Sequence, residues 1–354
     1  MLETTRRRVL QGVGAGGMVA VAGCSASNAG PDSTPTTDAE PSRKATKPVV
    51  DRVAADPTDI PGPIDRSEPA AVDVTLEAEE VTAELEDGTT FDYMTYGGQI
   101  PGPFVRVRVG DTVNLTFRNP EGNAMPHNVD FHAVAGPGGG AEATMAMPGE
   151  TKRLRFKATY PGAYIYHCAV PNLDMHISAG MFGIILVEPE EGLPEVDHEF
   201  YLGQHELYAK EGDGGFQFDA DAMAREEPSH VLMNGEPYAI TPDRHGPMKV
   251  KTGETARVYF VTGGPNLTSS FHPIGSVWEE LWPQGSLTTE PQTHIQTTPV
   301  PPGSTTIATM SFPVPGDFKL VDHALSRVAS KGCMAVVRAE GPENPDVFDP
   351  NPKR

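Results

Sequence analysis

The chain has 354 residues, a length that predicts more than one domain, and its 37 glycines and 35 prolines favour turn-rich β structure over a helical bundle. Acidic residues outnumber basic residues by 48 to 27, and the formal charge of −21 argues against nucleic acid and anionic lipid as partners. Such an acidic surface suits solubility at very high salt, so we expect a halophilic source, although an ordinary acidic protein has a similar composition.

The first 24 residues predict an export signal. Residues 5–10 (TRRRVL) resemble a twin-arginine signal, and the apolar run at 13–22 is too short to span a membrane. Residues 21–24 (VAGC) resemble a lipobox, which predicts lipid attachment at Cys24, with simple cleavage as the alternative. We therefore expect the protein on the outer face of the cytoplasmic membrane or outside the cell, with a lipid anchor as its membrane contact.

Residues 25–66 are rich in Ser, Thr, Pro, Ala and Asp without apolar periodicity, and predict a disordered tether. A polar, proline-containing segment at 188–194 predicts a boundary between domains at 67–190 and 191–340, followed by a tail at 341–354. Apolar patterns predict short strands at residues 72–76, 105–109, 112–117, 154–156, 163–167, 181–187, 199–202, 248–250, 256–261 and 306–310. This pattern predicts an all-β fold of two Greek-key β-sandwich domains.

The second domain repeats parts of the first. Residues 160–167 (YPGAYIYH) are similar to 314–323 (VPGDFKLVDH), and 179–187 are similar to 331–337. His323 then corresponds to His167, but it is followed by alanine instead of cysteine. Cys333 stands where the first domain has a methionine, and is interpreted as a small buried residue. A thiolate metal site is therefore expected only in the first domain.

Residues 166–181 (YHCAVPNLDMHISAGM) contain three potential copper ligands in a short loop: Cys168, His176 and Met181. A blue-copper electron-transfer site needs one thiolate, two imidazoles and a weak thioether. The missing imidazole is expected from His127, in the upstream motif MPHNVDFHA. The alternative, a buried cysteine beside an incidental histidine, is disfavoured because the loop spacing and the upstream motif agree.

A second metal site is expected next to the first. His167 directly precedes Cys168, and His132 lies five positions after His127. Odd separations in an extended strand place side chains on opposite faces, so His132 and His167 should meet away from the cysteine. Asp130 lies between the two upstream histidines and is available for proton transfer. The other histidines without metal-like spacing are interpreted as surface or structural residues: His198, His205, His230, His245 and His294.

Together these motifs resemble those of the copper-containing nitrite reductases over about residues 69–340. The matching segments are 127–132 (HNVDFH), 167–181, 271–275 (FHPIG) and 320–323 (LVDH). The resemblance implies two cupredoxin domains per chain, a homotrimer, and one type 1 and one type 2 copper per subunit. The implied type 1 ligands are His127, Cys168, His176 and Met181.

For the type 2 copper, the resemblance implies His132 and His167 of one subunit together with His323 of the next. Asp130 and His272 match the family's catalytic pair, and Ile274 matches a residue that crowds the substrate. The expected reaction is the one-electron reduction of nitrite to nitric oxide and water. A copper with three imidazoles keeps an open position for nitrite, and Asp130 and His272 suit a general acid and its relay. A small blue-copper protein or a cytochrome is expected as electron donor.

Other functions fit the sequence less well. A two-domain multicopper oxidase needs paired His-x-His motifs for a trinuclear cluster, whereas this chain has only His127-x4-His132 and no His-Cys-His triplet. A non-enzymatic blue-copper electron carrier would leave His132, His167 and His323 without a role. An inactive structural cupredoxin is opposed by the complete ligand set.

Overall fold

The computed structural model describes residues 47–352; the predicted export signal and Cys24 lie outside the described residues. The strands are β1 (Ala71–Glu86), β2 (Thr89–Tyr96), β3 (Val105–Arg108), β4 (Thr112–Arg118), β5 (Asp130–Phe131), β6 (Thr151–Lys157), β7 (Gly162–His167), β8 (Phe182–Glu188), β9 (His198–Leu207), β10 (Ala209–Gly212), β11 (Gly215–Phe218), β12 (His230–Met233), β13 (Met248–Lys251), β14 (Thr255–Gly264), β15 (Ser269–Ile274), β16 (Trp278–Pro283), β17 (Gln292–Ile295), β18 (Thr298–Val300), β19 (Ser304–Ser311), β20 (Gly316–Asp322) and β21 (Met334–Glu340). The helices are short: η1 (Pro137–Gly140), α1 (Ala141–Thr144), α2 (Leu173–Ser178), α3 (Ala220–Ala224) and α4 (Leu325–Lys331). Within residues 47–352, the length and hydropathy needed for a membrane-crossing helix are not reached anywhere.

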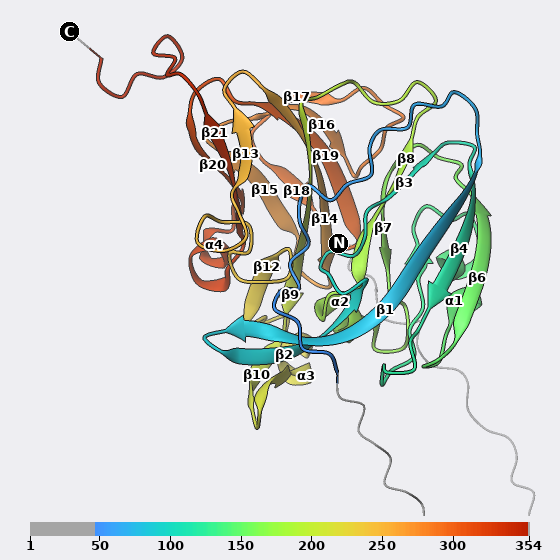
Figure 1. Ribbon diagram of the computed structural model, residues 1–354. Coiled ribbons are helices and arrows are strands. Elements are labelled where there is room, and N and C mark those ends of the chain that lie inside the picture. Colours follow the sequence, from blue (N-terminus) through green and yellow to red (C-terminus); the bar gives the residue numbers. More distant parts are fainter. Residues whose placement is uncertain (1–46, 353–354) are drawn as a thin grey trace, which may run out of the picture. The chain divides into compact units, whose positions relative to one another are not determined.

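Two four-stranded sheets form the first half of this body, with strand orders β2-β1-β4-β6 and β3-β8-β7-β5 (Figure 1). In β4, Val113, Leu115 and Phe117 are buried and alternate with more exposed residues. This two-residue period is what a strand with one face on a core requires. The strands predicted for this half are confirmed.

The second half contains a six-stranded sheet, β12-β9-β14-β19-β16-β17, a five-stranded sheet, β13-β21-β20-β15-β18, and the hairpin β10-β11. The strands predicted here lie in β9, β13, β14 and β19, so the all-β class is confirmed. The internal repeat is also visible, because β7, α2 and β8 follow one another as β20, α4 and β21 do. The pairs β7–β8 and β20–β21 are both antiparallel. In addition, β8 pairs in parallel with β3, and β21 pairs in parallel with β13.

Each half has its own apolar core, and a third core joins the two halves. The joining core contains Phe104 and Phe182 from the first half and Tyr201 and Tyr259 from the second. The ring centroids of Phe104 and Tyr201 are 5.1 Å apart in an edge-on arrangement, a geometry that aromatic pairs favour. The predicted domain boundary near residues 188–194 stays a prediction.

Residues 47–66 show that the prediction of a disordered tether over 25–66 is wrong for this part of the chain. They run as an extended strap along the body, and Val53 and Ala54 are buried. The backbone N–H groups of these two residues donate to the Glu236 carboxylate at 2.8 and 3.1 Å. A strap held by hydrogen bonds from its backbone to a side chain needs no apolar periodicity, so composition alone could not reveal it. The earlier part of the predicted tether lies outside the described residues.

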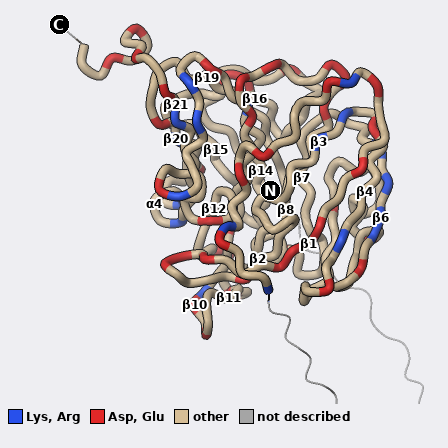
Figure 2. The backbone as a smooth tube through the Cα atoms, viewed as in Figure 1, with Lys and Arg blue, Asp and Glu red and all other residues tan. Residues whose placement is uncertain are grey.

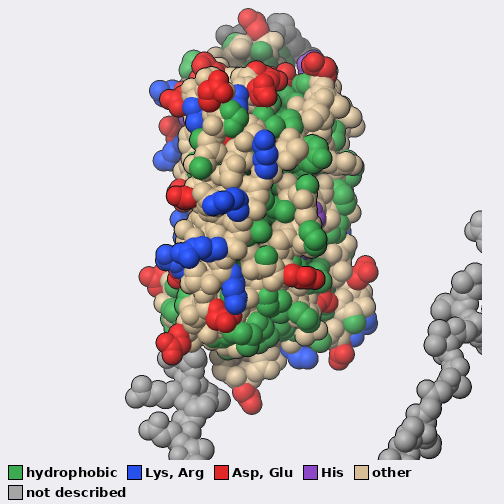
Figure 3. Space-filling view, turned by 90° about the vertical axis from the view of Figure 1, so that its right-hand side faces the viewer, with side chains coloured by type: hydrophobic (Ala, Val, Ile, Leu, Met, Phe, Trp, Pro, Cys, Tyr) green, Lys and Arg blue, Asp and Glu red, His purple; other side chains and the backbone are tan. Residues whose placement is uncertain are grey.

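Basic residues are clustered along β6, whereas acidic residues are spread over both halves (Figure 2). The face on the right-hand side of Figure 1 carries Lys and Arg side chains across its centre (Figure 3). The basic residues of β6, an edge strand, are Lys152, Arg153, Arg155 and Lys157. Positive charge on an exposed edge discourages pairing with another strand, so these residues have a structural explanation.

Candidate metal centres

Three buried side chains from two distant segments meet in the first half and form the first ligand group: His127, Cys168 and His176. The Cys168 Sγ atom lies 4.0 Å from His127 Nδ1 and 3.5 Å from His176 Nδ1, and the three ligand atoms lie within 4.8 Å of one another. Met181 is fully buried, and its backbone is hydrogen-bonded to both Cys168 and His176. The structure therefore brings three of the four predicted type 1 ligands together, and the backbone of the fourth, Met181, is bonded to two of them.

Asn128 ties the two segments of this group together. Its Oδ1 accepts a hydrogen bond from the Ala169 N–H at 2.7 Å and lies 3.6 Å from Cys168 Sγ. Its backbone oxygen accepts a hydrogen bond from the Tyr96 hydroxyl at 2.6 Å. These buried contacts hold the loop of His127 in place against the cysteine, as a preorganised site requires. Asn128 is not among the residues predicted from the sequence, although its position directly after a predicted ligand is a signal for it.

Burial raises the pKa of the Cys168 thiol to about 11, and burial together with His127 lowers the pKa of His176 to about 4. Both pKa shifts arise because a low-dielectric pocket disfavours the charged form of each side chain. A bound cation reverses this balance for the thiol, because it stabilises the thiolate directly. One thiolate and two imidazoles beside a buried methionine suit copper, so the residues fit that metal.

A second ligand group, Asp130, His132 and His167, shares the peptide unit between His167 and Cys168 with the first. Its ligand atoms lie within 4.8 Å of one another, and the two Nε2 atoms of its histidines are 3.1 Å apart. His167 Nδ1 is 3.0 Å from the Cys168 carbonyl oxygen. Because a carbonyl only accepts, Nδ1 carries the proton and Nε2 offers its lone pair to the group.

Partial desolvation of the ring and the neighbouring His167 lower the pKa of His132. The neutral imidazole is the form that binds metal ions, so this shift favours metal binding over protonation.

The expectation of a regular strand through both upstream histidines is wrong. Only Asp130 and Phe131 form a strand, β5, which pairs with β7. The backbone of His127 forms an isolated bridge with Ala146 instead. The two histidines still reach separate ligand groups. The short strand β5 holds His132 beside β7, and the loop before β5 carries His127 to Cys168.

Gly139 makes room for the Asp130 carboxylate. Its φ is +53°, and a Cβ atom at this position would lie 1.8 Å from Asp130 Oδ1. Any side chain here would therefore displace the carboxylate as well as occupy a left-handed backbone region. The run of three glycines at 138–140 is the signal in the sequence that could have predicted this close approach.

The remaining predicted site residues lie together in the second half. His272 is on β15 and His323 follows β20, and their ring centroids are 5.1 Å apart. Ile274, also on β15, is 40% exposed. Among residues 47–352 of this single chain, His323 is not part of the second ligand group. The chain thus presents two partial sites, one in each half.

Asp322 is a buried carboxylate that fixes the backbone next to His323. It accepts hydrogen bonds from the side chains of Gln204 at 3.0 Å and Arg327 at 2.6 Å, and from the backbone N–H of Ser270 at 3.0 Å. The His323 N–H donates to the Ser270 carbonyl at 2.8 Å. Charge-assisted hydrogen bonds of this kind give a rigid support for a ligand.

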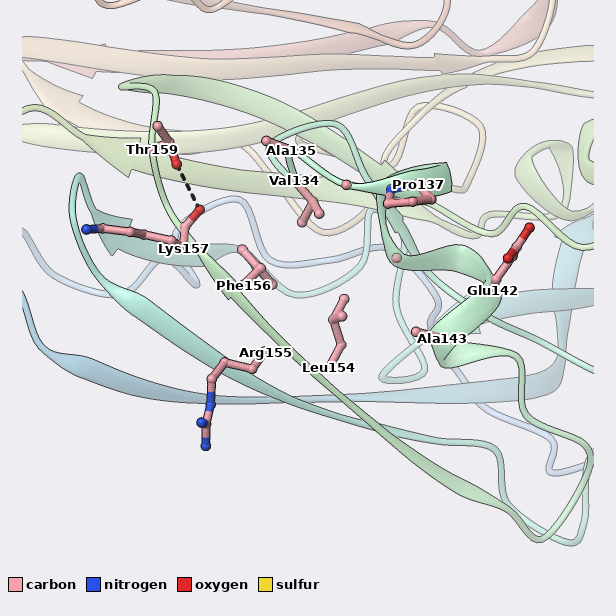
Figure 4. Close-up of a pocket in the computed structure, with 12 residues that line it drawn as sticks. Val134, Ala135, Pro137, Glu142, Ala143, Leu154, Arg155, Phe156, Lys157 and Thr159 are labelled. Carbon is pink, nitrogen blue, oxygen red and sulfur yellow. Dashed lines mark hydrogen bonds between the residues drawn. The ribbon is translucent and has the colours of Figure 1, made fainter.

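A cavity of about 590 Å³ lies between β6 and the segment of η1 and α1 (Figure 4). Its lining residues are Val134, Ala135, Gly136, Pro137, Gly140, Glu142, Ala143, Leu154, Arg155, Phe156, Lys157 and Thr159. The predicted site residues are not among them. The two ligand groups therefore lie outside the lining of this cavity.

Known proteins are similar to this chain in sequence and in fold. A family model described as multicopper oxidase matches residues 77–192. A copper-containing nitrite reductase of Neisseria meningitidis serogroup B is 46% identical over 305 residues, covering 85% of this chain and 77% of that protein. One of Cereibacter sphaeroides is 36% identical over 292 residues, covering 76% of each. A solved copper nitrite reductase from Nitrosomonas europaea is similar with a TM-score of 0.70 and 34% identity, covering 78% of this chain and 96% of that chain.

Proposed function

Because the chain belongs to the copper-containing nitrite reductases, we propose that it divides nitrite reduction between two copper centres of different kinds. The protein is a copper-dependent enzyme that reduces nitrite, on a cupredoxin-like fold. The multicopper oxidase alternative is weaker, because nitrite reductases match over most of the chain. The observation that carries the division of labour is the pair of ligand groups joined by one peptide unit.

The first ligand group, completed by Met181, is proposed as the type 1 site, and the second as part of the type 2 site. Bound copper supplies one-electron transfer at the first site, and both an electron and a Lewis acid for nitrite oxygen at the second. The protein connects the sites through the covalent link between Cys168 and His167. The hydrogen bond from His167 Nδ1 to the Cys168 carbonyl, at 3.0 Å, reinforces this short path.

The reaction consumes one electron and two protons per nitrite, breaks one N–O bond, and releases nitric oxide and water. Asp130 lies within the second ligand group, where its carboxyl group can donate a proton to the departing oxygen. His272 is proposed as the relay that resupplies this proton. Its Nδ1 is 2.6 Å from the Gln296 carbonyl oxygen, which orients the ring and leaves Nε2 for exchange with water or substrate.

We further propose a homotrimer in which His323 of one subunit completes the second ligand group of the next. Two features support this arrangement: within residues 47–352 of one chain the second group offers two imidazoles, and His323 is exposed. His272 and Ile274 would then reach the shared site with His323, and the exposed Ile274 side chain would crowd the bound nitrite. A site assembled between subunits makes activity dependent on assembly.

The proposed division is tested by His132→Ala, with His294→Ala as a matched control at an exposed position. We expect His132→Ala to lose nitrite turnover and to keep the visible absorption of the cysteine–copper site, whereas the control keeps both. Nitric oxide is followed with an electrode under anaerobic conditions, with oxygen uptake in parallel. Unchanged turnover in His132→Ala would refute the role of the second group, and oxygen uptake without nitric oxide would favour an oxidase.

The shared site is tested by mixing two inactive variants, His132→Ala and His323→Ala, in one co-expression. In random heterotrimers about a quarter of the subunit interfaces combine the two intact contributions, so about a quarter of wild-type activity is expected. Separately purified variants mixed without subunit exchange should stay inactive. Failure of the co-expressed mixture to regain activity would contradict a site built from two subunits.

The predicted export signal and Cys24 lie outside the described residues. The halophilic source and the electron donor are properties of the protein's surroundings. We propose that Cys24 carries lipid on the outer face of the cytoplasmic membrane, and that a small blue-copper protein or a cytochrome supplies electrons. Mass spectrometry of the mature N-terminus distinguishes a lipidated Cys24 from a simple cleavage product. Steady-state turnover with each type of donor tests the proposed electron donor, and turnover at low and high salt tests the expected halophilic source.

A further inference from the structure

Glu80 is a buried carboxylate in direct contact with a ligand of the first group. It lies on β1, 2% exposed, and its Oε1 is 3.3 Å from His127 Nε2. The other ring nitrogen, Nδ1, faces Cys168 Sγ at 4.0 Å. Since an ionised carboxylate only accepts hydrogen bonds, this contact places the imidazole proton on Nε2 and leaves Nδ1 free as a ligand.

The Glu80 carboxylate is itself held in place by the loop that carries His127. Its Oε1 accepts hydrogen bonds from the backbone N–H groups of Ala124 at 2.9 Å and Met125 at 2.7 Å. The Glu80 N–H donates to the Asn123 side chain at 3.1 Å. The carboxylate therefore cannot leave the ring without breaking the loop's own hydrogen bonds, and its position is set before metal binds.

A positive charge lies on the far side of this carboxylate. Lys47, in the strap, places its Nζ 3.7 Å from Glu80 Oε2 and 3.0 Å from Asp92 Oδ2. The side chains of Lys47 and Glu80 are 21% and 1% exposed. The Lys47 charge is shared between two carboxylates and partly screened by water, so the negative charge behind the His127 ring is only partly compensated.

We propose that Glu80 is a positioning residue for the Cys168 metal centre, which orients the His127 ring and lowers the reduction potential of the copper bound there. The proposal rests on the proposed function, because it assumes copper at the first ligand group. A negative charge close to a metal stabilises its more positive state, so Cu(II) is favoured over Cu(I). Glu80 would thereby influence how readily the first site passes its electron to the second.

A purely structural role for Glu80, as a clamp on the loop, is the competing explanation. The chain offers a matched control for it in Glu236, 5% exposed. Glu236 also accepts two consecutive backbone N–H groups, from Val53 and Ala54, and one histidine nitrogen, His245 Nε2 at 2.8 Å. Its partners lie in the strap and in the second half instead of in the metal centre.

The experiment compares Glu80→Gln and Glu236→Gln in the copper-loaded, full-length protein. The glutamine oxygen keeps the backbone hydrogen bonds and the charge is lost. The midpoint potential of the first site is measured by redox titration of its visible absorption band, and stability by urea unfolding. We expect both variants to lose stability, but only Glu80→Gln to raise the midpoint potential. An unchanged potential in Glu80→Gln, or an equal shift in Glu236→Gln, would overturn the proposal.

Lys47→Met gives a second test with the opposite sign, which remains available if Glu80→Gln does not fold. Removal of the lysine leaves the Glu80 charge less compensated, so the midpoint potential should fall. A rise or no change in Lys47→Met would also overturn the proposal. Absence of the cysteine–copper band in the wild-type protein would refute the first copper site itself, whereas a normal band without these shifts refutes only the role of Glu80.

Discussion

Substitution of Arg106 should show that a buried ion pair in this protein contributes more to stability than an exposed one. The Arg106 side chain, on β3, is 1% exposed, and it pairs with Glu188 at the end of β8 and with Glu199 on β9. It also donates to the Pro61 carbonyl in the strap at 2.8 Å. One guanidinium thus connects both halves and the strap. We predict that Arg106→Met destabilises the folded protein by about 3–5 kcal/mol, because a buried carboxylate loses its counter-charge.

The magnitude follows from what remains after the substitution. Glu199 keeps Arg257 at 3.0 Å and the Tyr259 hydroxyl at 2.7 Å, but Glu188, 2% exposed, keeps only a long 3.4 Å contact from a strap N–H. Most of the cost should therefore come from Glu188. The double variant Arg106→Met/Glu188→Gln should recover a large part of the lost stability, since the stranded charge is gone.

Urea unfolding followed by circular dichroism measures these differences at a fixed protein concentration. Arg338→Met is the control, because Arg338 pairs with Asp317 where the side chains are 38% and 36% exposed, and exposed pairs contribute little. The reasoning is refuted if Arg106→Met is as stable as Arg338→Met, or if the double variant is as unstable as Arg106→Met alone.

Three further predictions follow from the described residues. Burial lowers the pKa of His205 from 6.5 to about 4, so between these pH values the unfolded chain binds more protons than the folded protein. The free energy of unfolding should therefore fall by up to about 3 kcal/mol as the pH drops from 6.5 to 4. Unfolding titrations at several pH values should show that His205→Gln lacks this slope. Gly139→Ala should displace Asp130 and reduce nitrite turnover by roughly tenfold or more, in line with the loss of a general acid, with the cysteine–copper absorption band unchanged; equal turnover would show that the carboxylate position is not critical. Removal of copper by a chelator should leave Cys168 as a thiol with a pKa of about 11. Its alkylation should therefore be slow at pH 7 and should accelerate as the pH rises. Rapid alkylation at pH 7 would contradict a buried thiol.

The sequence by itself determined the secondary structure class and the identity of the candidate ligands. Strands such as β4 were predictable because a two-residue alternation of apolar residues is a local property of the chain. The residues Cys168, His176 and Met181 were predictable because thiolate, imidazole and thioether chemistry lies within one short segment. His127 lies beside Cys168 and His176, although the strand expected to carry it is largely a loop.

Only the tertiary structure decided which distant residues support the two ligand groups. Glu80 lies on β1, far from His127 in sequence, and no local pattern connects them. Asp322 and Gly139 act through close contacts that exist only after the strands have paired and the glycine segment has folded over Asp130. The strap was misread because its backbone partners come from Glu236, a residue of the other half of the chain. Local patterns report the period of a strand and the chemistry of a side chain, whereas burial and charge partners depend on contacts between segments that the sequence does not place side by side.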